Sequence, residues 1–202
     1  MNGKWLVAMA AVALGLALHG CDETDLGSVQ CTVREDLSGR LAVVRIVPAE
    51  SLAPEPAAGV TWDGTAGVVA SVGEFKDLSA VRLADIGFAA GKSDAGLAFV
   101  KVTVPRGPQA KWPAMFLGAS DEAVRKAAAT LTDAQAAQNI GRTLKLTLKL
   151  PADVVSAGLA TPVRGVQPAH QKGEATLVVP LDRGREDGAP IVWHVTWESK
   201  RG

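Results

Sequence analysis

Two cysteines, Cys21 and Cys31, carry the side chains in this sequence that are most open to covalent chemistry. Cys21 follows Gly20 at the end of an apolar run, Leu6–Leu18, which itself follows Lys4. A positive start, an apolar core and a small residue before the cleavage point are the parts of a secretory signal peptide. The run has 13 residues, fewer than the roughly 20 that a membrane-spanning helix needs. The stretch therefore predicts export followed by cleavage.

The residues around Cys21 indicate which covalent step follows export. Leu18-His19-Gly20-Cys21 resembles the lipobox of bacterial lipoproteins, although His19 departs from the small or uncharged residue usual there. The resemblance implies diacylglyceryl transfer to the Cys21 thiol, cleavage before Cys21 and acylation of the new amino terminus. It implies a protein anchored by lipid on the outside of the cytoplasmic membrane or on the outer membrane. Two alternatives remain: a secreted protein with an incidental cysteine, and a Cys21–Cys31 disulfide, which lipidation would exclude.

Three tryptophans are the candidates for ligand binding. Trp193 and Trp197 are four residues apart on an expected strand, so they share one of its faces, and Trp62 can join them. Packing in the core explains such a pair. The second interpretation is the wall of an apolar cavity, because ligand sites are mostly apolar with few polar groups.

Motifs for catalysis and for cofactors are weak or missing. Residues 87–93, Gly-Phe-Ala-Ala-Gly-Lys-Ser, approach a phosphate-binding loop but have one residue too few between the glycines. Neither His170 nor His194 has a partner at zinc-ligand spacing. No Gly-x-Ser-x-Gly sequence occurs. We therefore expect no catalytic residue, no metal, no cofactor and no nucleotide, and a chain that is not an enzyme.

The charge balance limits the partners. The chain has 21 Lys and Arg and 21 Asp and Glu, and loss of Lys4 with the signal leaves one net negative charge. This balance predicts no nucleic-acid partner and no broad basic face for anionic lipid. The expected partner is the membrane, reached through lipidated Cys21, with a lipid or another envelope protein as a possible second partner.

The pattern of apolar residues predicts an α+β fold: a mainly antiparallel β-sheet with two or three helices packed on one face. Residues 29–33 and 41–47 alternate around a Gly-bearing loop, as a hairpin does. The clearest strand is 142–150, where four leucines alternate with Thr and Lys. Helices are expected at 77–87, with Asp77 as cap, and at 120–141. Further strands are expected at 60–62, 68–72, 96–104, 163–167, 175–181 and 191–197, the last two paired as a hairpin.

These elements divide the chain into a signal peptide (1–20), an acidic tether (21–28) and one domain (29–200). The order of parts resembles the LppM family of bacterial envelope lipoproteins: a lipobox, an acidic-loop hairpin, the Gly141–Pro151 stretch Gly-Arg-Thr-Leu-Lys-Leu-Thr-Leu-Lys-Leu-Pro and a final pair of strands within Gly173–Trp197. The chain departs from the family by ending at 198–202 without an apolar anchor. The resemblance implies an α+β domain outside the cytoplasmic membrane that binds lipid or glycolipid.

The leading hypothesis is therefore a membrane-anchored, non-catalytic envelope lipoprotein whose domain binds lipid or another apolar ligand. One alternative is a protein–protein interaction or structural module of the envelope. A periplasmic enzyme is the third.

Overall fold

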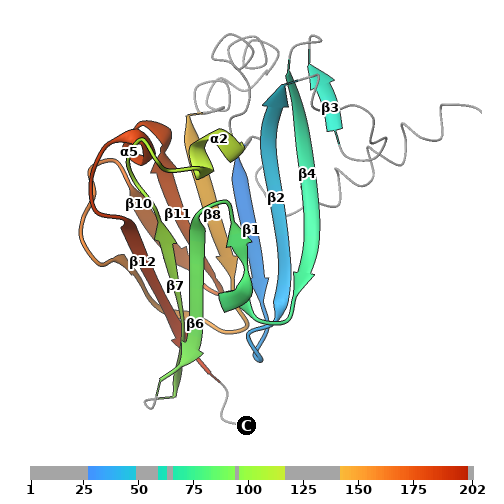
Figure 1. Cartoon of the computed structure of the whole chain (residues 1–202). Helices are drawn as coiled ribbons and strands as arrows, with labels where there is room; N and C mark the ends of the chain where they lie inside the picture. Colours follow the sequence, from blue (N-terminus) through green and yellow to red (C-terminus); the bar gives the residue numbers. More distant parts are fainter. Residues whose placement is uncertain (1–26, 49–58, 63–65, 94–95, 117–141, 200–202) are drawn as a thin grey trace, which may run out of the picture.

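The chain folds into two β-sheets that lie face to face (Figure 1). The computed structural model describes residues 27–48, 59–62, 66–93, 96–116 and 142–199. The seven-stranded sheet has the order β10-β11-β8-β1-β2-β4-β3, and the five-stranded sheet has the order β5-β6-β7-β12-β9. In chain order the strands are β1 (Ser28–Val33), β2 (Gly39–Pro48), β3 (Gly59–Trp62), β4 (Ala66–Phe75), β5 (Arg82–Leu83), β6 (Ile86–Lys92), β7 (Leu97–Val104), β8 (Thr143–Lys149), β9 (Val154–Leu159), β10 (Gln167–Gln171), β11 (Glu174–Pro180) and β12 (Ile191–Glu198).

Most strand pairs are antiparallel, as the sequence predicts, and the exception is the parallel pair β1 and β8. The described helices are two short α-helices, α2 (Trp112–Phe116) and α5 (Leu181–Arg185), with a 3-10 turn at Leu78–Ala80. The second expected helix, 120–141, lies outside the described residues.

The core lies between the sheets and is built by strict alternation. On β8 the side chains of Leu144, Leu146 and Leu148 are buried, as the sequence predicts. On β12 the inward residues are Ile191, Trp193, Val195 and Trp197. Because side chains on a strand alternate between its faces, each sheet gives one apolar face to this core.

The helix expected at 77–87 is wrong beyond its first turn. Asp77 does accept a hydrogen bond from the Ser79 N–H at 2.8 Å, but the chain leaves helical geometry at Val81. Residues 86–92 form β6, in which Ile86 and Phe88 face the core. The Gly and Ala residues on either side of Phe88 hide this two-residue period in the sequence. The glycine-rich stretch 87–93 is therefore mostly strand.

The expected hairpin of residues 175–181 and 191–197 is also wrong. Both strands form, but β11 belongs to the seven-stranded sheet and β12 to the five-stranded sheet. Helix α5 joins them across the end of the sandwich. Two smaller corrections concern the strands just before β11. β9 has no counterpart among the expected strands, and β10 begins at Gln167, where the expected strand 163–167 ends.

The hydrogen bonds define two opposite ends of the sandwich. The α5 end consists of residues 84–85, 105–116, 142, 160–166 and 181–190, and β1 and β8 begin there. The hairpin end holds the turns at 34–38 and 172–173 and the ends of β6 and β12. In Figure 1 the α5 end is at the top and the hairpin end at the bottom.

Candidate functional site at the α5 end

The structure tests the predicted site residues unequally. Cys21 lies outside the described residues, and of Trp62 the structure describes only its place on β3. Trp193 and Trp197 do share one face of β12, as expected, and both are buried in the core between the sheets. This burial agrees with the core-packing interpretation, and a role of these tryptophans in ligand binding remains a prediction.

Trp193 has one unusual feature. Trp193 is 0% exposed, and its indole Nε1–H has no hydrogen-bond acceptor among the residues that the structure describes. Its partners across the five-stranded sheet are Val102 and Leu159. A buried donor without an acceptor costs about 1–3 kcal/mol, so this group calls for an explanation.

Cys31 faces the core from β1, as its alternation with polar neighbours predicts. Burial raises the pKa of its thiol to about 12, so the thiol is protonated at neutral pH. The thiolate is the reactive form of cysteine, so Cys31 in the folded domain is inert.

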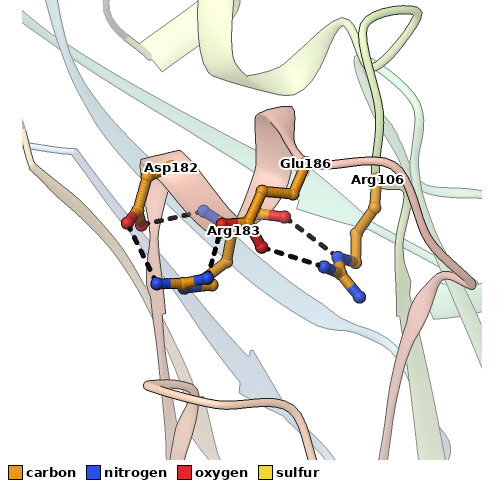
Figure 2. Close-up of polar contacts among 4 residues, drawn as sticks. All are labelled: Arg106, Asp182, Arg183 and Glu186. Atoms are coloured by element: carbon orange, nitrogen blue, oxygen red, sulfur yellow. Dashed lines mark hydrogen bonds and ion pairs between the residues drawn. The ribbon is translucent and has the colours of Figure 1, made fainter.

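The α5 end holds the main cluster of charged side chains that bond to one another. Four residues form it: Arg106, Asp182, Arg183 and Glu186 (Figure 2). Arg183 pairs with Glu186 on one side and with Asp182, at 3.4 Å, on the other. Arg106 donates from Nε to the Arg183 carbonyl at 3.0 Å and pairs with Glu186 at 3.4 Å. The side chain of Arg106 is only 14% exposed, so a guanidinium from the end of β7 holds α5 in place.

A second set of contacts fixes α2 beside α5. The Asp85 carboxylate accepts from the backbone N–H groups of Lys111 and Trp112 at 2.7 and 2.9 Å, where free N–H groups at a helix start need an acceptor. The indole of Trp112 donates to the Pro105 carbonyl at 2.9 Å. A Cβ at Gly184 would lie 2.1 Å from this ring, so α5 packs directly on Trp112.

The bonded groups leave other cations of the α5 end unpaired. Arg185 belongs to α5, the Arg142 carbonyl accepts from Leu181 at 2.9 Å, and Arg164 precedes Gly165, which lies beside Arg183. Arg142, Arg164 and Arg185 are exposed, and none takes part in an ion pair between described residues. These three exposed guanidinium groups around α5, which have no ion-pair partner among the described residues, can therefore bind anions.

Sequence reasoning missed this site because Arg106 lies 77 positions before Arg183, and Arg142 and Arg164 come from two further segments. The expected hairpin of residues 175–181 and 191–197 would make the charged stretch 182–188 its loop. The available signal was the spacing of Arg183 and Glu186, which suits a helical turn. Among the described residues, no three His, Cys, Asp or Glu side chains come together in a way that could hold a metal ion. None of the described helices is long and apolar enough to cross a membrane.

Comparisons with known proteins identify no relative of this chain. No protein-family model, no curated protein and no solved structure matches the chain. The function of the chain is therefore inferred from its sequence and its structure.

Proposed function

We propose that this chain is a bacterial envelope lipoprotein, anchored through Cys21, whose β-sandwich domain is non-catalytic and binds an apolar ligand. The observation that carries the proposal is the apolar run 6–18 ending in Gly20-Cys21, followed closely by a domain that begins at β1. Because β1, the first strand in the chain, begins at Ser28, cleavage before Cys21 leaves the whole seven-stranded sheet intact. The mature amino terminus is then short and available to lipid.

The proposal includes the finer part of the fold prediction, a helix within 120–141 that packs on one face of the sheet. Its support comes from the face of the seven-stranded sheet that points away from the core. There Val44 is 2% exposed, and its partner Ser28 and nearby Thr147 are buried as well. Side chains on an uncovered outer face would meet water, so the burial of these three residues supports a helical layer on that face.

The ligand part of the proposal rests on the unpartnered indole of Trp193. A buried water is held by two to four polar partners. Among the described residues, the side chains of the core cluster are apolar apart from the indole N–H groups of its three tryptophans, Trp112, Trp193 and Trp197, and the Cys31 thiol. A ligand with an apolar body and one acceptor oxygen, such as an acyl ester, fits this environment better than water does.

The anchor is tested by membrane fractionation of three forms of the full chain: unchanged, Cys21→Ser and Cys31→Ala. We expect the unchanged chain and Cys31→Ala to stay with the membrane until detergent is added. We expect Cys21→Ser, which cannot carry the lipid, to be released in a larger amount. Equal release of all three forms would overturn the lipid anchor. Cys31→Ala is the matched control because it removes the other thiol and leaves the lipobox unchanged.

The ligand is tested separately with oleate as the probe. Trp193→Phe keeps an aromatic ring in the core and removes only the indole donor. We expect the unchanged chain to bind oleate and the variant to bind it at least about fivefold more weakly, the effect of losing a net hydrogen bond of about 1 kcal/mol. Absence of binding to the unchanged chain, or equal binding by both, would contradict this part of the proposal.

A further inference from the structure

The position of the tether decides which end of the domain can meet the membrane. Gly27, the first residue of the tether that is described, lies at the α5 end, where its carbonyl accepts from the Lys145 N–H at 3.0 Å. Six peptide steps separate Cys21 from Gly27 and reach at most about 20 Å when fully extended. If Cys21 carries lipid, Gly27 and the α5 end around it are therefore held within about 20 Å of the bilayer surface.

The same end carries an excess of cations. Its described residues hold six Lys and Arg side chains and four carboxylates. Three of the carboxylates are engaged within the fold: Asp182 and Glu186 by Arg183, and Asp85 by backbone N–H groups. The neutral balance of the whole chain predicted no broad basic face, but folding collects exposed arginines at this one end.

We propose that Arg142, Arg164 and Arg185 bind the phosphates of anionic lipid headgroups and seat the α5 end on the bilayer. This inference rests on the proposed anchor at Cys21 and names the surface that the anchored domain uses. Guanidinium groups suit the task because their planar donors match two phosphate oxygens at once. Lys111, exposed just before α2, adds a fourth cation at the same end.

The acidic residues of the tether oppose the attraction between the arginines and an anionic membrane. Asp22, Glu23 and Asp25 have the opposite charge and lie between the lipid and the domain. The net charge near the membrane is therefore small, and attraction of the whole domain at a distance is weak. The contact depends instead on individual arginines that reach phosphates within about a Debye length, 8–10 Å at physiological salt. Its strength should respond to the loss of particular side chains.

A fluorescent label at either end of the domain tests the contact in the mature lipidated protein. Thr161→Cys places the label at the α5 end and Gln171→Cys at the hairpin end, and both positions are exposed and uncharged. Cys31 stays unlabelled because it is buried. The protein is reconstituted in nanodiscs that contain a lipid with a nitroxide-bearing headgroup as quencher. One set has phosphatidylcholine alone, and the other has equal parts of phosphatidylcholine and phosphatidylglycerol.

We expect quenching at Thr161→Cys to be at least about twofold greater on the anionic discs than on the neutral ones. The difference should disappear in 1 M salt, where the Debye length is about 3 Å. It should also disappear when Arg142, Arg164 and Arg185 are all changed to Gln. A control with Arg40, Lys92 and Lys172 changed to Gln removes three exposed cations of the hairpin end and should keep it.

Two results would overturn the inference, and they are distinguishable. If the protein stays on the discs but Thr161→Cys and Gln171→Cys are quenched equally, or the arginine variant behaves like its control, the arginine contact is absent while the lipid anchor stands. If the protein extracted from membranes does not stay on discs of either composition, the anchor itself fails, and the proposed function fails with it.

Discussion

At the α5 end of the sandwich, loops bond to residues far away in the sequence, whereas at the hairpin end they mostly bond to close neighbours. Arg106 reaches α5, and Asp85 holds the start of α2. At the hairpin end, Arg34 N–H donates to the Ser38 carbonyl and Ser93 N–H to the Leu97 carbonyl, at 2.8 and 2.7 Å. The ion pair at that end, Arg34–Glu74, is more than half exposed on both sides. The α5 end is therefore the part of the molecule whose structure depends on tertiary contacts.

The largest expected effect follows a change at Gly184. Gly184→Ala places a Cβ 2.1 Å from the buried ring of Trp112, and the ring has little room to move. We expect a loss of about 3 kcal/mol in the free energy of unfolding, the upper range for overpacking. The control is Gly73→Ala on β4, where a Cβ meets no atom within 4 Å, and it should change stability by less than about 0.5 kcal/mol. Urea unfolding measures both, and equal effects would show that α5 does not pack tightly on Trp112.

The second effect compares two capping carboxylates. Asp85→Ala removes the acceptor of two N–H groups at the start of α2, so we expect a loss of about 2 kcal/mol. Asp77→Ala removes the acceptor of one N–H group in a local turn and should cost about 0.5–1 kcal/mol. Thermal unfolding at one pH ranks the two variants. The reverse order would break the distinction between tertiary and local bonding.

The third effect compares two arginines. Arg106→Gln removes the partly buried guanidinium that bonds to the Arg183 carbonyl and to Glu186, and we expect a loss of about 1.5 kcal/mol. Arg34→Gln breaks an exposed pair and should cost less than about 0.5 kcal/mol. Salt sharpens the test, because screening should reduce the small effect of Arg34→Gln further and leave most of the larger one. If the two substitutions cost the same, burial of Arg106 adds nothing.

The smallest effect concerns Cys31, the buried titratable group of β1. Burial raises its pKa from 9.0 in the unfolded chain to about 12 in the fold. Between these values the unfolded chain loses the thiol proton while the folded chain keeps it. The contribution of the buried thiol to the free energy of unfolding is therefore fully present below pH 9. It falls as the pH rises towards 12, by up to about 1.4 kcal/mol per pH unit. Near pH 10 the unchanged chain should have lost about 1.4 kcal/mol relative to Cys31→Ala, compared with their difference at pH 7. Parallel pH profiles of the two proteins would contradict the burial of this thiol.

The sequence predicts those elements whose alternation is plain. β8 shows it in three leucines and β12 in apolar residues at every inward position, so both strands and their buried faces follow from periodicity. The expected helix 77–87 overlaps the first two residues of β6, because Ala and Gly occupy the positions of β6 around Phe88 and mask the two-residue period. The separation of β11 and β12 into different sheets could not be predicted, since it depends on α5 packing against Trp112.

The site divides in the same way. That Trp193 and Trp197 share a face is a local property, and the sequence contains it. The Arg106–Glu186 pair joins residues 80 positions apart, and no pattern along the chain indicates it. The arginines around α5 come from three separate segments, so their convergence is a property of the tertiary fold.

The central claim is that Cys21 is the lipidated first residue of the mature chain. The intact mass of the protein, extracted from membranes with detergent, tests it most directly. The account predicts the mass of residues 21–202 plus a diacylglyceryl group and an amide-linked acyl chain, and loss of that species in Cys21→Ser. A mass without lipid would contradict it, most clearly if Cys21 were instead bonded to Cys31.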